Sequence, residues 1–309
     1  MSALLPELFE GFETRRIDTG EAEIFLRLGG SGPPLLLLHG FPQTHAMWHR
    51  VAPALAEHFT LVIPDLRGYG ASSVPPSDAA HLAYSKRAMA ADMVRVMDQL
   101  GYDRFHLAGH DRGGRAAYRL ALDHGARVDR LAVLDIVPTY AMWHGMTTDL
   151  AMKVYHWLFL AQPEPLPERL IGGDPAFFLE YTMKSWTKGR RLDSFDSRAL
   201  EHYRGFYAEP ERIHATCEDY RAGQSCDLSH DEADRQVGRR IACPILAVWG
   251  AGGIPDETRQ PDVEDAPLAH WRDWADNVSG FAIDSGHFVA EENPEATASA
   301  LIKFMTEAA

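Results

Sequence analysis

The chain has 309 residues, of which 46% are hydrophobic and 24% are charged, and its formal net charge at pH 7 is -14. These proportions are typical of a globular protein and exclude an intrinsically disordered chain. The excess of 44 acidic over 30 basic residues repels nucleic acid and acidic membrane surfaces, so an anionic small-molecule partner would need a local basic pocket.

Strands and helices alternate through the first 138 residues. Strands are predicted where apolar runs or alternating patterns precede turn-rich segments, at 23–28, 35–38, 61–65, 105–108 and 130–136. Helices are predicted between them at about 48–57 and 85–100. Such alternation indicates an α/β fold with a parallel sheet and right-handed crossovers.

The pattern changes from Tyr140 to about Gly238, where long aromatic and charged helical stretches contain no convincing strand. Strands resume at 244–249 and 281–283, followed by a final helix at about 294–307. We therefore expect two parts, which are a sheet core made of residues 1–138 and 239–309 and an inserted helical cap made of residues 139–238.

The chain carries features of a cytoplasmic protein. Its first 16 residues place acidic side chains where a signal peptide has a basic region followed by a long apolar run. The apolar run Leu35 to Leu38 is far shorter than the roughly 20 residues needed to span a bilayer. Cys217, Cys226 and Cys243 are odd in number and lack close pairs, which favours free thiols and a reducing compartment.

The segment Gly109 to Gly113 lies between a predicted strand and a predicted helix and has the spacing of a nucleophile elbow, with Asp111 where esterases carry serine. A carboxylate that displaces a leaving group from saturated carbon forms an ester, which water can cleave, whereas serine would form a stable ether. Asp111 therefore favours alkyl over acyl substrates. A helix-capping role is the structural alternative.

His287 follows the last predicted strand, in Ser285-Gly286-His287-Phe288, where this chain order places a general base. Its role would be to activate the water that cleaves the ester, although a surface-loop histidine is the plain alternative. Two carboxylates could orient it: Asp135, at the end of the strand after the elbow, and Asp256, beyond the strand that contains Trp249. We favour Asp135.

Two further features surround the elbow. The loop His39 to Pro42 can bring the Phe41 backbone N–H beside that of Arg112, forming an oxyanion hole for hydrolysis of the Asp111 ester. Arg112 and Arg115 share one helix face near a positive N-terminus, which is unfavourable for cations. We interpret them as a clamp for a substrate carboxylate, with structural pairing to acidic neighbours as the alternative.

No metal site or cofactor is expected. The 15 histidines include no HExxH and no clustered spacing with carboxylates that would place metal ligands on one helix face.

With these residues in view, the sequence resembles the fluoroacetate dehalogenases, a branch of the haloacid-cleaving α/β-hydrolases, over nearly its whole length. The segments that carry the resemblance are HGFPQTH (39–45), DLRGYG (65–70), GHDRGGR (109–115), LAVLDI (131–136), YHW (155–157), CEDYRAG (217–223) and SGHF (285–288). The resemblance implies an α/β-hydrolase fold, with Asp111 as nucleophile, His287 as base, Asp135 as its acid, and Arg112 with Arg115 as the carboxylate site.

The resemblance also implies a halide pocket formed by His156, Trp157 and Tyr220, and a homodimer. Imidazole, indole and phenol groups can donate hydrogen bonds to a leaving fluoride. Spacing alone would instead favour an amphipathic cap helix with its aromatic side chains in the core.

The expected function is hydrolysis of a haloacetate, such as fluoroacetate, to glycolate and halide. An epoxide hydrolase would use the same nucleophile, with cap tyrosines such as Tyr155, Tyr181 or Tyr220 donating to the epoxide oxygen; Arg112 argues against it. A binding protein without catalytic activity is the third alternative, but it would have little need for both Asp111 and His287.

Overall fold

The computed structural model describes residues 5–253 and 266–307. The described residues form an eight-stranded sheet with the order β1-β2-β4-β3-β5-β6-β7-β8. The strands are β1 (Glu13–Asp18), β2 (Glu23–Gly30), β3 (Pro34–Leu38), β4 (Thr60–Pro64), β5 (Phe105–His110), β6 (Val128–Leu134), β7 (Ile245–Gly250) and β8 (Val278–Ile283). Only β1 with β2 and β2 with β4 pair antiparallel, while the other pairs are parallel. The prediction of a mostly parallel α/β sheet is confirmed.

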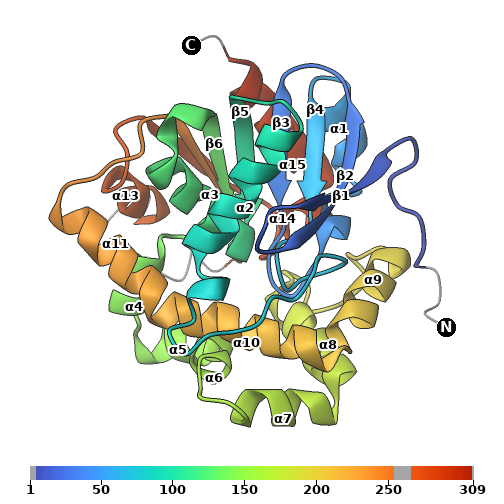
Figure 1. Ribbon diagram of the computed structural model, residues 1–309, viewed down its shortest axis with the longest axis vertical. Helices are drawn as coiled ribbons and strands as arrows, with labels where there is room; N and C mark the ends of the chain where they lie inside the picture. The colour runs from blue at the N-terminus through green and yellow to red at the C-terminus, as the bar shows by residue number, and fades with distance from the viewer. Residues whose placement is uncertain (1–4, 254–265, 308–309) are drawn as a thin grey trace.

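Helices cover both faces of this sheet (Figure 1). The helices of the core are α1 (Ala52–Ala56), α2 (Lys86–Gln99), α3 (Asp111–Asp123), α13 (Ala266–Arg272), α14 (Val289–Glu292) and α15 (Pro294–Thr306), with short 3-10 turns η1 (His45–Trp48), η2 (Leu82–Tyr84) and η3 (Gly125–Arg127). No helix in the described ranges is long and apolar enough to span a membrane.

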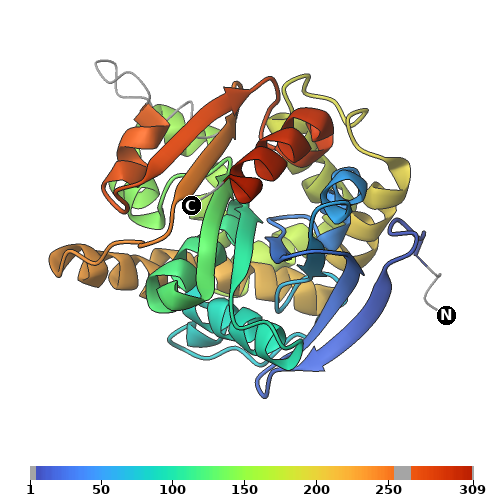
Figure 2. The same cartoon turned by 90° about the horizontal axis from the view of Figure 1, so that it is seen from above.

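Alternation along β3 shows how the sequence places these helices. Leu35 and Leu37 belong to the apolar cluster that includes residues of α1 and α15, whereas Leu36 and Leu38 belong to the cluster that includes residues of α2 and α3. Successive side chains of a strand point to opposite faces, so a continuous run of leucines suits a strand that is covered on both sides. Figure 2 shows the twist of the sheet from above.

Eight helices lie between β6 and β7, and residues 139–238 contain no strand. They are α4 (Thr139–His144), α5 (Thr148–Lys153), α6 (Tyr155–Leu160), α7 (Leu166–Gly173), α8 (Pro175–Trp186), α9 (Ser197–Tyr207), α10 (Pro210–Gln224) and α11 (Cys226–Gln236). Most of them gather beyond one end of the sheet (Figure 1). This end includes the carboxyl ends of the parallel strands, where α/β proteins bind their ligands.

Two expectations about the elements need correction. The single helix predicted at 48–57 is instead the turn η1 followed by α1. Pro53 lies at the start of α1, and proline is tolerated in the first turn of a helix but not in its interior. Strand β1 was not predicted, because only Ile17 of its six residues is buried and the sequence shows no alternating pattern there.

The three cysteines are free, as predicted.

Candidate active site

Asp111 is the first residue of α3 and directly follows β5. Its φ is 46°, in the left-handed region that Asp and Asn adopt more readily than most residues. Glycine is needed on both sides, because a Cβ on Gly109 would lie 2.5 Å from the Gly113 carbonyl oxygen and a Cβ on Gly113 would lie 2.2 Å from the His39 carbonyl oxygen. The predicted elbow therefore forms, and it presents a carboxylate at the end of the sheet.

The Asp111 carboxylate is 3% exposed and accepts a hydrogen bond from the Phe41 backbone N–H at 2.9 Å. Burial by itself would raise the pKa of Asp111, but the nearby charges of two histidines and of Arg112 and Arg115 outweigh it, so the pKa is lowered. Asp111 is thus held in the ionised form that a nucleophile requires.

His287 pairs with Asp135. Its Nδ1 lies 2.6 Å from Asp135 Oδ2, while Asp135 Oδ1 accepts the Gly250 N–H at 2.8 Å. A carboxylate can only accept, so Nδ1 is the donor, and Nε2 is able to accept a proton when the imidazole is neutral. Nε2 is buried and has no partner among the described residues. Asp256, the alternative acid, lies outside the described residues.

Burial lowers the pKa of His287, but the hydrogen bond and charge of Asp135, together with the charge of Asp111, raise it by more, so the pKa stands above its ordinary value. His287 and Asp111 therefore stabilise each other's charged forms. Removal of the charge on Asp111 would remove one of the causes that raise the pKa of His287.

The Phe41 backbone N–H, one of the two predicted oxyanion donors, donates to Asp111 Oδ1, which places it where the predicted role requires. Arg112, which would supply the second, follows Asp111 in the first turn of α3. Backbone N–H groups in a first helical turn have no partner inside the helix, so this position suits the predicted role.

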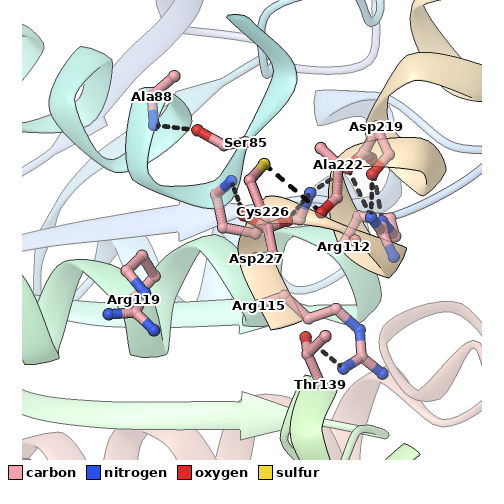
Figure 3. A network of polar contacts seen from close by, with 12 residues as sticks. Ser85, Ala88, Arg112, Arg115, Arg119, Thr139, Asp219, Ala222, Cys226 and Asp227 are labelled. Carbon is pink, nitrogen blue, oxygen red and sulfur yellow. Dashed lines mark hydrogen bonds and ion pairs between the residues drawn. The ribbon is translucent and has the colours of Figure 1, made fainter. Parts of the chain in front are cut away.

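Arg112 is held by a carboxylate that the sequence analysis did not single out. Its Nε lies 3.0 Å from Asp219 Oδ2, and its Nη2 lies 2.6 Å from Asp219 Oδ1 and 2.7 Å from the Asp219 carbonyl oxygen (Figure 3). Its guanidinium also stacks 4.2 Å from the centre of the Tyr220 ring. Only Nη1 is left, and it is buried without a partner in the described chain.

Arg115 has a different environment. Its Nη1 donates to the Val137 carbonyl at 3.0 Å and to Thr139 Oγ1 at 3.1 Å (Figure 3), and its guanidinium lies 4.4 Å from the Trp157 ring centre. No ion pair joins it to any described residue, and its Nε is buried without a partner there. Burial and the charge of Arg112 lower its pKa, so an added anion would stabilise the charged form.

His156 and Trp157 come from α6 and Tyr220 comes from α10, and each of the three is 1% exposed. The structure brings them together, with the Tyr220 ring centre 5.6 Å from that of His156 and 6.0 Å from that of Trp157. His156 Nδ1, Trp157 Nε1 and the Tyr220 hydroxyl all lack partners in the part of the chain that is described.

Burial lowers the pKa of His156 well below its ordinary value and raises the pKa of Tyr220 well above its own. Both are therefore neutral near pH 7. Buried polar groups without partners are rare in proteins. Three of them meet here, and the charge of Asp111 acts on two of the three, His156 and Tyr220, so the cluster suits a small hydrogen-bond acceptor.

Trp186, which the sequence analysis did not single out, contacts both His156 and His287. Its ring centre lies 4.3 Å from that of His156 and 5.3 Å from that of His287, and its carbonyl accepts the His287 N–H at 2.9 Å. Trp186 and Asp219 belong to helices far from the elbow in sequence, so no local spacing could have marked them.

Comparison with known proteins relates this geometry to a family. Residues 33–294 match the sequence profile of the alpha/beta hydrolase fold. A fluoroacetate dehalogenase of Burkholderia sp is 45% identical over 97% of this chain and 96% of its own length. A soluble epoxide hydrolase of Corynebacterium sp. (strain C12) is 31% identical over 89% of this chain and 91% of its own length. Among solved structures, a candidate alpha/beta hydrolase from Nostoc sp PCC 7120 has a TM-score of 0.91 and 49% identity, covering 96% of this chain and 99% of that one.

Proposed function

Since the chain belongs to the alpha/beta hydrolase fold family, we propose that it is a haloacetate dehalogenase, which converts fluoroacetate and water to glycolate and fluoride. One observation carries this proposal. The ionised Asp111 carboxylate lies in one buried site with three neutral polar groups that have no partner among the described residues, and with Arg115, a cation that pairs with no described carboxylate. The similarity to the fluoroacetate dehalogenase of Burkholderia sp supports it.

In the first step, an Asp111 oxygen attacks the halogen-bearing carbon from the side opposite the halide. A carbon–oxygen bond forms and the carbon–halogen bond breaks, with its electron pair leaving on the halide and with inversion at carbon. His156, Trp157 and Tyr220 donate to the departing halide, where negative charge develops. Arg112 Nη1 and Arg115 hold the substrate carboxylate, which fixes the carbon in front of the nucleophile.

In the second step, His287 Nε2 removes a proton from water and the hydroxide attacks the carbonyl carbon of the Asp111 ester. The Phe41 and Arg112 backbone N–H groups stabilise the resulting oxyanion. The ester bond to the glycolate oxygen then breaks, and that oxygen takes the proton from His287. Asp135 stabilises the imidazolium in between. The Asp111 carboxyl, which keeps the other proton of the water, releases it to solvent and becomes a carboxylate again.

Formation of the ester changes the charge beside His287. In the free enzyme the charge of Asp111 contributes to the raised pKa of His287. Ester formation removes that charge, because the carboxylate becomes a neutral ester. The pKa of His287 therefore falls at the moment when a neutral base is required.

The proposal extends to organisation and location. Residues 139–238 act as a cap that contributes His156, Trp157 and Tyr220 to the site, while residues 1–138 and 239–309 form the core. A cytoplasmic location is supported by the three free cysteines. A homodimer rests on the family resemblance alone.

Epoxide hydrolysis is the second candidate, favoured by the similarity to the Corynebacterium enzyme and by the buried Tyr220 hydroxyl, which has no described partner. Tyr181 is 52% exposed, so it is poorly placed to contact an epoxide at Asp111. The buried Arg115 guanidinium, which pairs with no described carboxylate, favours an anionic substrate over a neutral epoxide.

The test is a panel of fluoroacetate, chloroacetate and bromoacetate against neutral haloacetonitriles and small epoxides. Release of fluoride measured with an ion-selective electrode, together with preference for acids over nitriles, supports the proposal. Turnover of epoxides without halide release from the acids would replace it with the second candidate.

A further inference from the structure

Asp219 is a fully buried carboxylate at the junction of core and cap. It lies on α10 and pairs with side chains from three other parts of the chain. These are Lys86 at the start of α2, Arg112 on α3 and Tyr69, whose hydroxyl donates to Asp219 Oδ2 at 2.7 Å. Neither sequence reasoning nor the proposed reaction assigns Asp219 a role.

The contacts with Arg112 leave that side chain little freedom. Asp219 occupies Nε and Nη2 through both carboxylate oxygens and through its own carbonyl (Figure 3). The guanidinium group is planar and rigid, so fixing two of its nitrogens fixes the third. The third is Nη1, the buried nitrogen with no partner in the described chain.

The charge on Asp219 is permanent at any working pH. Burial would raise its pKa, but the charges of Arg112 and Lys86 and the hydrogen bonds from them outweigh burial, so the pKa lies far below its usual range. Asp219 therefore balances the charge of Arg112 while the group is held. No such carboxylate balances Arg115 among the described residues.

Gly223, one helical turn beyond Asp219, completes the arrangement. A Cβ at this position would lie 3.0 Å from Arg112 Nη2 and 3.5 Å from Nη1. A side chain at position 223 would therefore press on the Arg112 guanidinium and displace it slightly. Helix α10 thus binds Arg112 through Asp219 and avoids a clash with it at Gly223.

We infer that Asp219 is a positioning residue for the substrate carboxylate, because it holds Arg112 from α10 so that the guanidinium offers only one nitrogen, Nη1 with its two N–H groups, to the substrate. The inference rests on the proposed function. It limits the contact of Arg112 with the substrate to this one nitrogen, and it couples the docking of α10 to the geometry of the carboxylate site.

The test compares two full-length variants, Asp219→Asn and Asp227→Asn. Asp227 is the matched control, because its Oδ2 lies 3.7 Å from Lys86 Nζ and its Oδ1 accepts the Lys86 N–H, but no contact joins it to Arg112 among the described residues. Asp219→Asn should raise KM for fluoroacetate about tenfold or more with kcat changed less than about threefold. Asp227→Asn should leave KM within about twofold of wild type, even where both variants melt at lower temperature.

A double-mutant cycle separates positioning from general structural damage. If Asp219 acts through Arg112, Asp219→Asn should change kcat/KM by less than about twofold when Arg112 is already leucine. Independent, multiplying losses would overturn the inference. Should Asp219→Asn fail to fold, Asp219→Glu keeps the charge but moves it by one methylene, and it should raise KM in the same way.

The outcomes also separate this inference from the proposed function. Active wild type with an unchanged KM in Asp219→Asn or Asp219→Glu would overturn the inference alone. Wild type that releases no halide from any haloacetate would overturn both.

Discussion

The candidate site has two halves that use their polar atoms in different ways: a sheet-edge half, at the carboxyl ends of the strands, and a helical half, contributed by α6 and α10. In the sheet-edge half, Asp111 and Asp135 accept backbone N–H groups and His287 pairs with Asp135. In the helical half, His156 Nδ1 and Trp157 Nε1 have no partner in the described chain. The groups of the sheet-edge half already make hydrogen bonds to one another in the free protein. The groups of the helical half are left to bind the negative charge that develops on the departing halide. Catalysis depends on such differential stabilisation.

Asp111→Asn gives the largest expected effect, because it removes the nucleophile from the sheet-edge half. Turnover should be abolished, since a neutral amide is a poor nucleophile. The fold should persist, because Asn is nearly isosteric and tolerates the positive φ of this position. Halide release and thermal melting measure the two effects. Substantial residual activity would assign Asp111 a lesser role.

His287→Asn should allow the first step and block the second. The ester should then accumulate, because the general base acts only on the water. Mass spectrometry of the peptide that contains Asp111 should show a substrate-derived adduct in this variant. In wild type, a single turnover in heavy-oxygen water should label Asp111 and not the glycolate hydroxyl. A solvent-labelled first product and no adduct would exclude the covalent route.

Arg115→Leu and Arg112→Leu compare the two carboxylate contacts. Both should raise KM and lower kcat/KM, by about 2 to 5 kcal/mol for loss of one partner from a buried charge pair. The loss should be larger for Arg115→Leu, because Asp219 already balances Arg112 whereas Arg115 pairs with no described carboxylate. Steady-state kinetics with chloroacetate test this order. Unchanged kinetics in both variants would show that these two arginines do not bind the substrate carboxylate.

The pH dependence of kcat should arise from titration in the sheet-edge half alone, since His156 and Tyr220 stay neutral near pH 7. Ester hydrolysis needs neutral His287, so kcat should fall about tenfold per pH unit below the pKa of His287 in the ester. By contrast, kcat/KM reports the steps up to halide displacement and should fall much less. Parallel losses in both parameters would show that His287 also acts in the first step.

The same pKa shift has the opposite effect on stability. The pKa of His287 is raised in the folded protein, so its stabilisation is complete below the ordinary value of 6.5 and is lost as pH rises through the raised value. Melting temperature should therefore decline with rising pH more in wild type than in His287→Asn, which lacks the titrating group.

Trp157→Phe should have the smallest effect, because it removes one of the cap donors and keeps an aromatic ring. Loss of a hydrogen bond to a charged group costs about 1.5 to 3 kcal/mol. Defluorination should suffer more than debromination, since bromide needs less help to leave. The rates of fluoride and bromide release by Trp157→Phe, each relative to wild type, give the comparison. Equal losses of rate on both substrates would indicate that Trp157 acts only in packing.

The sequence alone could predict the sheet-edge half of the site better than the helical half. The elbow and the His287 loop were located because strand ends, flanking glycines and chain order are local signals. Spacing around His156 and Trp157 favoured a core helix, and only the family resemblance indicated a pocket. The contact between Asp219 and Arg112 joins residues 107 positions apart. No periodicity encodes such a contact, because it depends on how α10 docks on the core.

Burial of the reacting groups has a kinetic consequence. Asp111 is 3% exposed, and His287 and Tyr220 are each 1% exposed, so we expect substrate entry to require a transient opening of the chain. If the open form is a minor population, the apparent affinity for substrate is weakened by that fraction. Glycolate and halide must leave by the same motion, and in such enclosed sites opening commonly limits turnover. Solvent viscosity should then slow kcat in wild type but not in the variants whose chemistry is slow.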